Sequence, residues 1–127
     1  MNHRLAVAIE ECSGNIDKVA EHFGRCSKFI VCEINQNKEV IMKETYFNPL
    51  SGHHGGQCQL PGYIKQFDVN TIIAGGMGRK AVANFHQYGI EVITAPGLEY
   101  ENALNLFLQN KLSGYEECAG HDHDHEC

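Results

Sequence analysis

Four clusters of cysteine, histidine and glycine residues indicate the chemistry of this chain, and the first is His22-Phe23-Gly24-Arg25-Cys26. It places an imidazole, a thiol and a cation within five residues. A neighbouring guanidinium lowers the pKa of a thiol, and a thiolate binds soft metal ions. We therefore expect Cys26 to be a thiolate ligand and His22 an imidazole ligand or hydrogen-bonding partner. A solvated loop held to the core by Phe23 explains the same residues equally well.

The second cluster runs from Gly52 to Cys58 and sets two imidazoles and a thiol among three glycines, just before an expected helix. A helix N-terminus favours an anionic ligand or a thiolate. The spacing matches no zinc signature such as Cys-x-x-Cys, and a mobile loop with incidental histidines is the alternative. Adjacent histidines in a glycine loop bring no packing benefit, which favours a functional interpretation. The candidates in this loop are His53, His54, Gly56 and Cys58.

The third cluster is the glycine-rich segment 75–81, in which Gly76, Gly78 and Ala81 match the dinucleotide fingerprint Gly-x-Gly-x-x-Ala. That fingerprint normally follows the first strand, and residues 94–95 lack the acid expected after the next strand. What remains is a nest of backbone N–H groups, which suits an anionic metal cluster as well as a phosphate. A nucleotide-binding regulatory module therefore stays open as an alternative. The candidates here are Gly76, Met77, Gly78 and Arg79, with packing favoured over a thioether contact for Met77.

The fourth cluster is the C-terminal tail, which holds two thiols and three imidazoles within ten residues. Such a tract binds Zn, Ni, Cu or Fe ions in solution. We expect a flexible acidic metal-binding tail at residues 115–127, separate from a cluster-binding body at residues 1–114. A disordered acidic tail, or a Zn/Ni storage protein built around the tail, are the alternatives. The ligand candidates are Cys118, His121, His123, His125 and Cys127.

Charge and hydropathy exclude several classes of partner. The net charge is -6, and residues 115–127 contain five acids and no Lys or Arg, so the body is nearly neutral. The chain has no basic stripe that a nucleic acid would require. We find neither a signal peptide nor a run of about 18 apolar residues that would span a membrane. The sequence thus predicts a cytoplasmic protein, in which the six cysteines stay reduced.

The elements that position these clusters follow from hydrophobic periodicity. We expect strands at residues 4–9, 28–34, 38–47, 69–74 and 90–94, and helices at residues 58–67, 81–88 and 99–111, with a short helix near residues 17–22. The order βββαβαβα predicts a mixed sheet. If the first three strands meander, the loops after the first, third, fourth and fifth strands open at one carboxyl-end edge. Open α/β sheets bind ligands at that edge.

Three motifs in this order resemble the dinitrogenase iron–molybdenum cofactor biosynthesis family, of the NifX and NifB C-terminal type. They are residues 22–26 with Phe29, the glycine loop that ends at Cys58, and residues 73–81 with Phe85 and Gly89-Ile90. The resemblance covers about residues 4–110. It implies a ribonuclease-H-like mixed five-stranded sheet flanked by helices, without nuclease chemistry.

The resemblance also implies a non-catalytic carrier or accessory protein for an iron–sulfur or iron–molybdenum-type cluster, with cluster donor or acceptor proteins as partners. Arg25 and Arg79 would balance the negative charge of the cluster. No catalytic set assembles from the sequence, and the first strand, residues 5–9, carries no carboxylate for nuclease metals. The implied cluster-facing residues are His22, Gly24, Arg25, Cys26, the loop 53–58 and residues 76–79.

Overall fold

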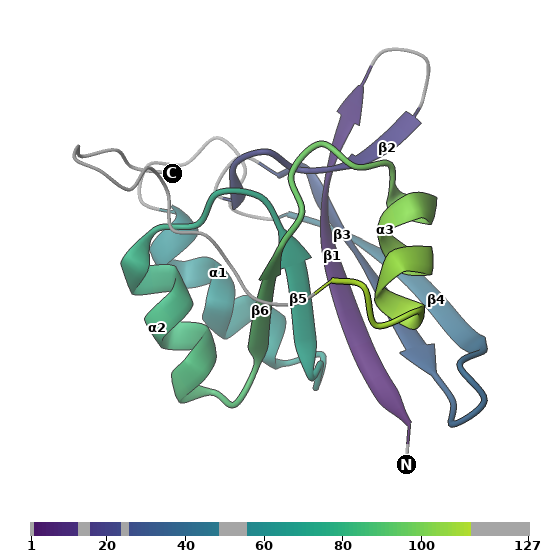
Figure 1. The fold of residues 1–127 in the computed structure, drawn as a ribbon. Helices are drawn as coiled ribbons and strands as arrows, with labels where there is room; N and C mark the ends of the chain where they lie inside the picture. Colours follow the sequence, from purple (N-terminus) through teal and green to yellow (C-terminus); the bar gives the residue numbers. More distant parts are fainter. Residues whose placement is uncertain (1, 13–15, 24–25, 49–55, 113–127) are drawn as a thin grey trace.

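The computed structural model describes residues 2–12, 16–23, 26–48 and 56–112 (Figure 1). The strands are β1 (His3–Cys12), β2 (Ile16–Val19), β3 (Lys28–Ile34), β4 (Val40–Phe47), β5 (Thr71–Ala74) and β6 (Glu91–Thr94). The helices are α1 (Gly56–Lys65), α2 (Arg79–Gln87) and α3 (Tyr100–Leu108). The fold is therefore mixed α/β, as the sequence predicted.

Two expectations about the elements are wrong. The described sheet has six strands and not five, because β2 forms where a short helix was expected. The backbone of β2 pairs antiparallel with the end of β1, from Ile9 opposite Val19 to Cys12 opposite Ile16. The first helix also begins at Gly56, two residues before the predicted start, so Pro61 lies inside α1 and not in its first turn.

The sheet has the order β4-β3-β1-β5-β6, and β2 pairs with β1 off this path. Strand β3 is antiparallel to both β1 and β4, whereas β5 is parallel to β1 and β6 is parallel to β5. Strands β1, β4, β5 and β6 thus point the same way. The prediction that these four strands run in the same direction, with their carboxyl ends at one edge, is confirmed.

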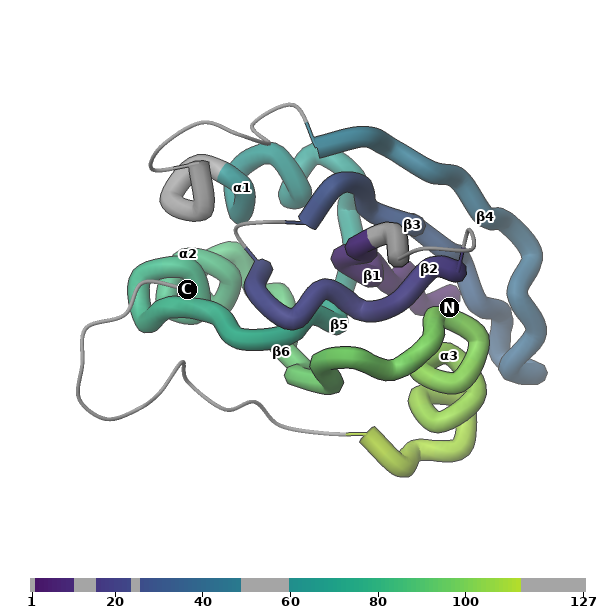
Figure 2. Tube along the Cα trace, turned by 90° about the horizontal axis from the view of Figure 1, so that it is seen from above, coloured from purple at the N-terminus to yellow at the C-terminus, as the bar shows by residue number. Residues whose placement is uncertain are grey.

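The alternation of side chains along the strands creates two hydrophobic cores, one on each face of the sheet. Ala6 and Ala8 of β1 face the first core, beneath α1 and α2, and Leu5 and Val7 face the second core, beneath α3. Seen from above, the sheet lies between α1 and α2 on one side and α3 on the other (Figure 2). The result is a three-layer sandwich, with one helical layer on each face of the sheet.

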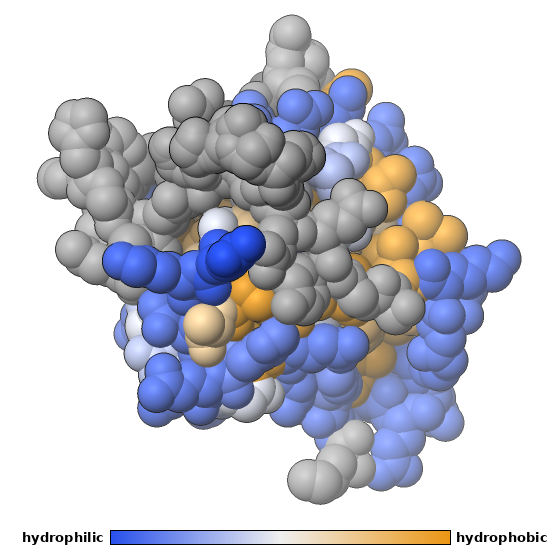
Figure 3. All heavy atoms as spheres, turned by 60° about the vertical axis from the view of Figure 1, so that its left-hand side comes forward, coloured by the Kyte–Doolittle hydropathy of each residue, from blue (hydrophilic) through white to orange (hydrophobic). Residues whose placement is uncertain are grey.

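The surface is consistent with this layering. On the face shown in Figure 3, hydrophilic side chains predominate around smaller hydrophobic areas. Among the described residues, no helix is long and apolar enough to cross a membrane.

Candidate functional site

The first and third sequence clusters meet at the carboxyl-end edge of the sheet. His22 forms a parallel bridge with Gly76, and the Phe23 N–H donates to the Gly76 carbonyl at 2.9 Å. The Gly76 N–H in turn donates to the Glu21 carbonyl at 2.7 Å. The segment after β2 therefore lies directly across the end of β5.

Gly75 makes this crossing possible. A Cβ atom at this position would lie 2.2 Å from the Ala20 carbonyl oxygen and 2.4 Å from the Glu21 carbonyl oxygen. Real Cβ atoms do not approach backbone atoms so closely, so only glycine allows the two backbones to touch. The paired glycines of the third cluster thus serve a close backbone contact as well as a loop.

The first cluster also contacts Asn48, which lies four residues before the second cluster. Asn48 is buried, and its Nδ2 donates to the Cys26 carbonyl at 2.8 Å and lies 3.6 Å from the Cys26 Sγ. Its backbone N–H donates to the Ser27 carbonyl at 2.9 Å. Sequence reasoning missed Asn48, although a polar residue between an expected strand and Pro49 was a signal for it. Asn48 thus holds the chain directly after β4 against Cys26.

Cys26 differs from its predicted state. The side chain is fully buried in the first core, and this burial raises the pKa of the thiol to about 12, against a smaller lowering by Asn48. The expectation of a lowered thiol pKa is therefore wrong for the described surroundings. Because a metal ligand must be a thiolate, coordination by Cys26 would have to release its proton.

The raised pKa predicts a loss of stability at alkaline pH. A thiol with an ordinary pKa of 9.0 ionises in the unfolded chain before the folded chain releases the proton of Cys26 near 12. The unfolded chain then binds fewer protons, so the free energy of unfolding falls as pH rises from about 9. Urea unfolding between pH 7 and pH 10 measures this slope, which Cys26→Ala should flatten. If the Cys26→Ala variant had the same slope as the wild type, that result would contradict the raised pKa of Cys26.

The buried thiol of Cys32 and the buried hydroxyl of Tyr100 also contribute to the fall of the free energy of unfolding with pH. A variant of Cys32 therefore serves as the control. Burial raises the pKa of Cys32 and that of Tyr100, whose hydroxyl lies 2.8 Å from the Cys32 Sγ. The Cys32→Ala variant should therefore remove a separate part of the slope. Cys32 itself lies in the second core.

The remaining described candidates divide into exposed and buried residues. His22 and Arg79 are exposed, and Gly78 precedes the first turn of α2. Phe23 and Met77 are fully buried in the first core. For Phe23 this confirms a role in holding its loop to the core, and for Met77 it favours packing. A thioether contact to a ligand stays a prediction.

One part of the predicted anion nest is wrong. The Gly76 N–H is already bonded to the Glu21 carbonyl, so this amide cannot also bind a phosphate or cluster. The remaining donors at this place are those of the first turn of α2, which a helix leaves without intrahelical partners.

Several candidates lie outside the described residues: Gly24, Arg25, His53, His54, Cys118, His121, His123, His125 and Cys127. The backbone of Gly56 and Cys58 is in the first turn of α1, as expected for a loop that leads into a helix. Within the described part of the chain, no three Cys, His, Asp or Glu side chains gather as a metal site. The described structure therefore joins the first and third clusters through their backbones and leaves the ligand set a prediction.

The sequence of this chain is similar to those of known proteins. The model of the dinitrogenase iron–molybdenum cofactor family matches residues 3–110. An uncharacterized protein of Methanocaldococcus jannaschii is 37% identical over 101 residues, which cover 79% of this chain and 85% of that protein.

Solved structures show the same fold. The apo form of the orange protein from Desulfovibrio gigas superposes with a TM-score of 0.71 at 25% identity, covering 93% of this chain and 94% of that one. The crystal structure of another Methanocaldococcus jannaschii protein has a TM-score of 0.68 at 25% identity, with coverages of 89% and 94%. On the match over residues 3–110, this chain belongs to the dinitrogenase iron–molybdenum cofactor family.

Proposed function

We propose that this protein is a non-catalytic carrier of an iron–sulfur or molybdenum-containing metallocluster, which it holds at the carboxyl-end edge of the sheet. The observation that carries the proposal is the convergence of the sequence clusters there. Hydrogen bonds of Phe23 and Gly76 join the first and third clusters, and Asn48, four residues before the second cluster, is hydrogen-bonded to Cys26 of the first. Membership of a cofactor family, and the apo form in which the orange protein was solved, support a cargo of this class.

The chemistry of the cargo assigns a role to each group. Thiolates of Cys26 and Cys58 would coordinate soft metal ions, and His22, His53 and His54 would act as ligands or hydrogen-bond donors. Arg25, Arg79 and the amides of the first turn of α2 would offset the negative charge of the cluster. A carrier needs ligand exchange and no bond-making chemistry on a substrate, so it requires no general acid or base.

Anaerobic reconstitution with iron and sulfide, with and without molybdate, tests this function. We expect charge-transfer bands in the visible spectrum of the wild type, with matching metal and sulfide content, and their loss in the Cys26→Ala/Cys58→Ala double variant. The Cys32→Ala variant is the matched control, since it removes a buried thiol of the second core. It should bind cluster as the wild type does.

Two outcomes would contradict the proposal. A wild type that stays colourless and takes up only zinc would favour a storage role for residues 115–127. The same reconstitution on a chain ending at residue 114 separates the tail from the body. We expect cluster binding to persist there, and its loss would overturn the assignment of the cluster to the carboxyl-end edge.

A further inference from the structure

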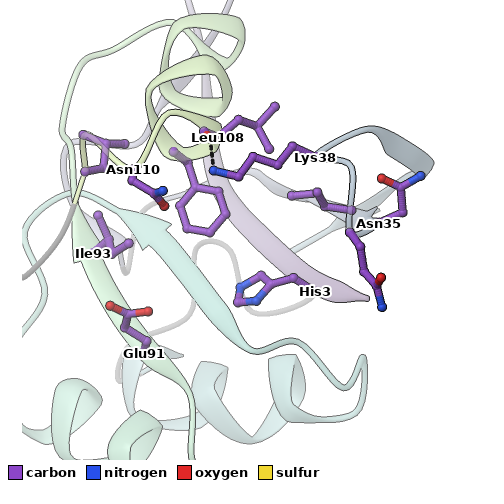
Figure 4. Close-up of a pocket in the computed structure, with 11 residues that line it drawn as sticks. His3, Asn35, Lys38, Glu91, Ile93, Leu108 and Asn110 are labelled. Carbon is purple, nitrogen blue, oxygen red and sulfur yellow. Dashed lines mark hydrogen bonds between the residues drawn. The ribbon is translucent and has the colours of Figure 1, made fainter. Parts of the chain in front are cut away.

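A pocket of about 460 Å³ lies at the opposite edge of the sheet from the proposed cluster site. His3 begins β1 and Glu91 begins β6, so the pocket lies at the amino ends of the parallel strands. The turn between β3 and β4 and the C-terminal end of α3 complete it. Figure 4 shows His3, Lys38 and Glu91 around the cavity, with Leu108 of α3 on its rim. Its volume is in the range of small-molecule sites.

A chain of hydrogen bonds fixes the polar floor of this pocket. The His3 Nε2 lies 2.8 Å from the Oγ1 of Thr71, which is fully buried, and the Thr71 hydroxyl donates to Glu91 Oε1 at 3.5 Å. In this pattern the Nε2–H of His3 donates to Thr71, and its Nδ1 is left as an acceptor. Burial lowers the pKa of His3, against an opposing effect of Glu91.

Lys38 lies on the other side of the pocket in an unusual conformation. Its φ is +64°, in the left-handed region that disfavours every residue with a Cβ and makes glycine the default in a hairpin turn. Asn35 holds this turn, because its Oδ1 accepts from the N–H groups of Asn37 and Glu39, both at 2.9 Å. The Lys38 Nζ reaches across to donate to the Leu108 carbonyl at 3.0 Å. The Asn35 hydrogen bonds thus hold Lys38 in this conformation, from which its side chain crosses the pocket to α3.

The lining limits the class of ligand. The Lys38 ammonium and the Glu91 carboxylate lie on different sides of the cavity. Phe107 and Ile93 add apolar surface to its lining. Lys38 is the one Lys or Arg among the described residues that line the pocket, so a phosphate-rich ligand would meet Glu91 with little positive charge in compensation. A metal ion would need more donors, since no three metal-ligating side chains gather anywhere in the described residues.

We propose that this pocket binds a small zwitterionic organic molecule with a planar apolar body. Its carboxylate pairs with Lys38, its ammonium pairs with Glu91, and its planar part packs against Phe107. The site is separate from the proposed cluster site and does not depend on it.

The probe is 4-(aminomethyl)benzoate, titrated into the full chain while the histidine ring signals are followed by NMR. The His3 signal is assigned from the His3→Gln variant. We expect saturable shifts of His3 with a Kd of about 1 mM or lower, and no shift of His22 at the other edge. Benzoate and benzylamine each lack one charge and should bind roughly tenfold more weakly or worse, the loss of about one charged hydrogen bond.

Two variants separate recognition from folding. Lys38→Gly relieves the left-handed backbone, so its melting temperature should equal or exceed that of the wild type, while its affinity for the probe should fall about tenfold. The Glu91→Gln variant should bind the probe more weakly than the wild type and bind benzoate with unchanged affinity. The proposal is overturned if His3 shows no saturable shift up to about 10 mM probe, or if Lys38→Gly binds as tightly as the wild type. It is also overturned if benzoate and benzylamine bind as tightly as the probe. None of these results bears on cluster reconstitution.

Discussion

Replacing Gly75 by alanine is expected to destabilise the fold by roughly 3 kcal/mol or more. The added Cβ would overlap carbonyl oxygens of Ala20 and Glu21 at 2.2 and 2.4 Å, and these are backbone atoms that cannot rotate away. Relief requires the segment after β2 to move off the end of β5. That movement breaks the hydrogen bonds of Gly76 with Glu21 and Phe23, at 2.7 and 2.9 Å. Urea unfolding measured on both proteins gives the difference.

Gly62→Ala is the matched control for this prediction. Gly62 lies inside α1, and a Cβ there would meet only the Tyr88 hydroxyl, at the ordinary distance of 3.8 Å. Alanine is the better helix former by about 1 kcal/mol, so this variant should be as stable as the wild type or more stable. If Gly75→Ala were equally harmless, segment 20–23 would not lie against β5, and the convergence behind the proposed function would be wrong.

Replacing Phe23 by alanine is expected to cost about 3–5 kcal/mol of stability, the range for removing a buried aromatic ring. Phe23 is fully buried, and its ring packs edge-on against Phe85, with centroids 5.5 Å apart, and against Phe29 at 6.3 Å. The cavity would also loosen the segment that leads to Cys26. We therefore expect faster modification of the Cys26 thiol by a disulfide reagent, together with a lower midpoint of urea unfolding.

Phe47→Ala removes the same ring from an exposed position and serves as the control. The Phe47 residue is 74% exposed at the end of β4, so its loss should change stability by less than about 0.5 kcal/mol. A Phe23→Ala protein as stable as the Phe47→Ala protein would contradict the role of Phe23 in holding its loop. Unchanged thiol reactivity in a destabilised Phe23→Ala protein would show that Cys26 is protected by other contacts.

Local pattern was sufficient for much of the fold. The apolar run Leu5–Ile9, the hairpin of β3 and β4, and the alternation of strand and helix after Gly56 predicted the parallel direction of β1, β4, β5 and β6. Strand β2 was missed because its four residues, Ile-Asp-Lys-Val, show no clear period. Pairing with the end of β1 decided its conformation, and such pairing is invisible in a local window.

The candidate site, like the fold, was predicted from the sequence only in part. The types and spacing of His22, Cys26 and the glycines around Gly76 indicated a soft-metal or anion site at one edge, since residue chemistry and chain direction are local properties. Only the tertiary structure buried Cys26 and thereby raised the pKa of its thiol. Only the tertiary structure placed the Glu21 carbonyl, from a distant segment, where it accepts the hydrogen bond of the Gly76 N–H.

The sequence by itself determined most of the elements, the direction of the parallel strands and the edge at which the candidate ligands His22 and Cys26 lie. The tertiary structure decided which of those groups are buried, which are already bonded, and where His3, Lys38 and Glu91 come together. The physical reason is that burial, desolvation and hydrogen-bond partnership depend on contacts between residues far apart in the chain. Periodicity and motif spacing report only on near neighbours.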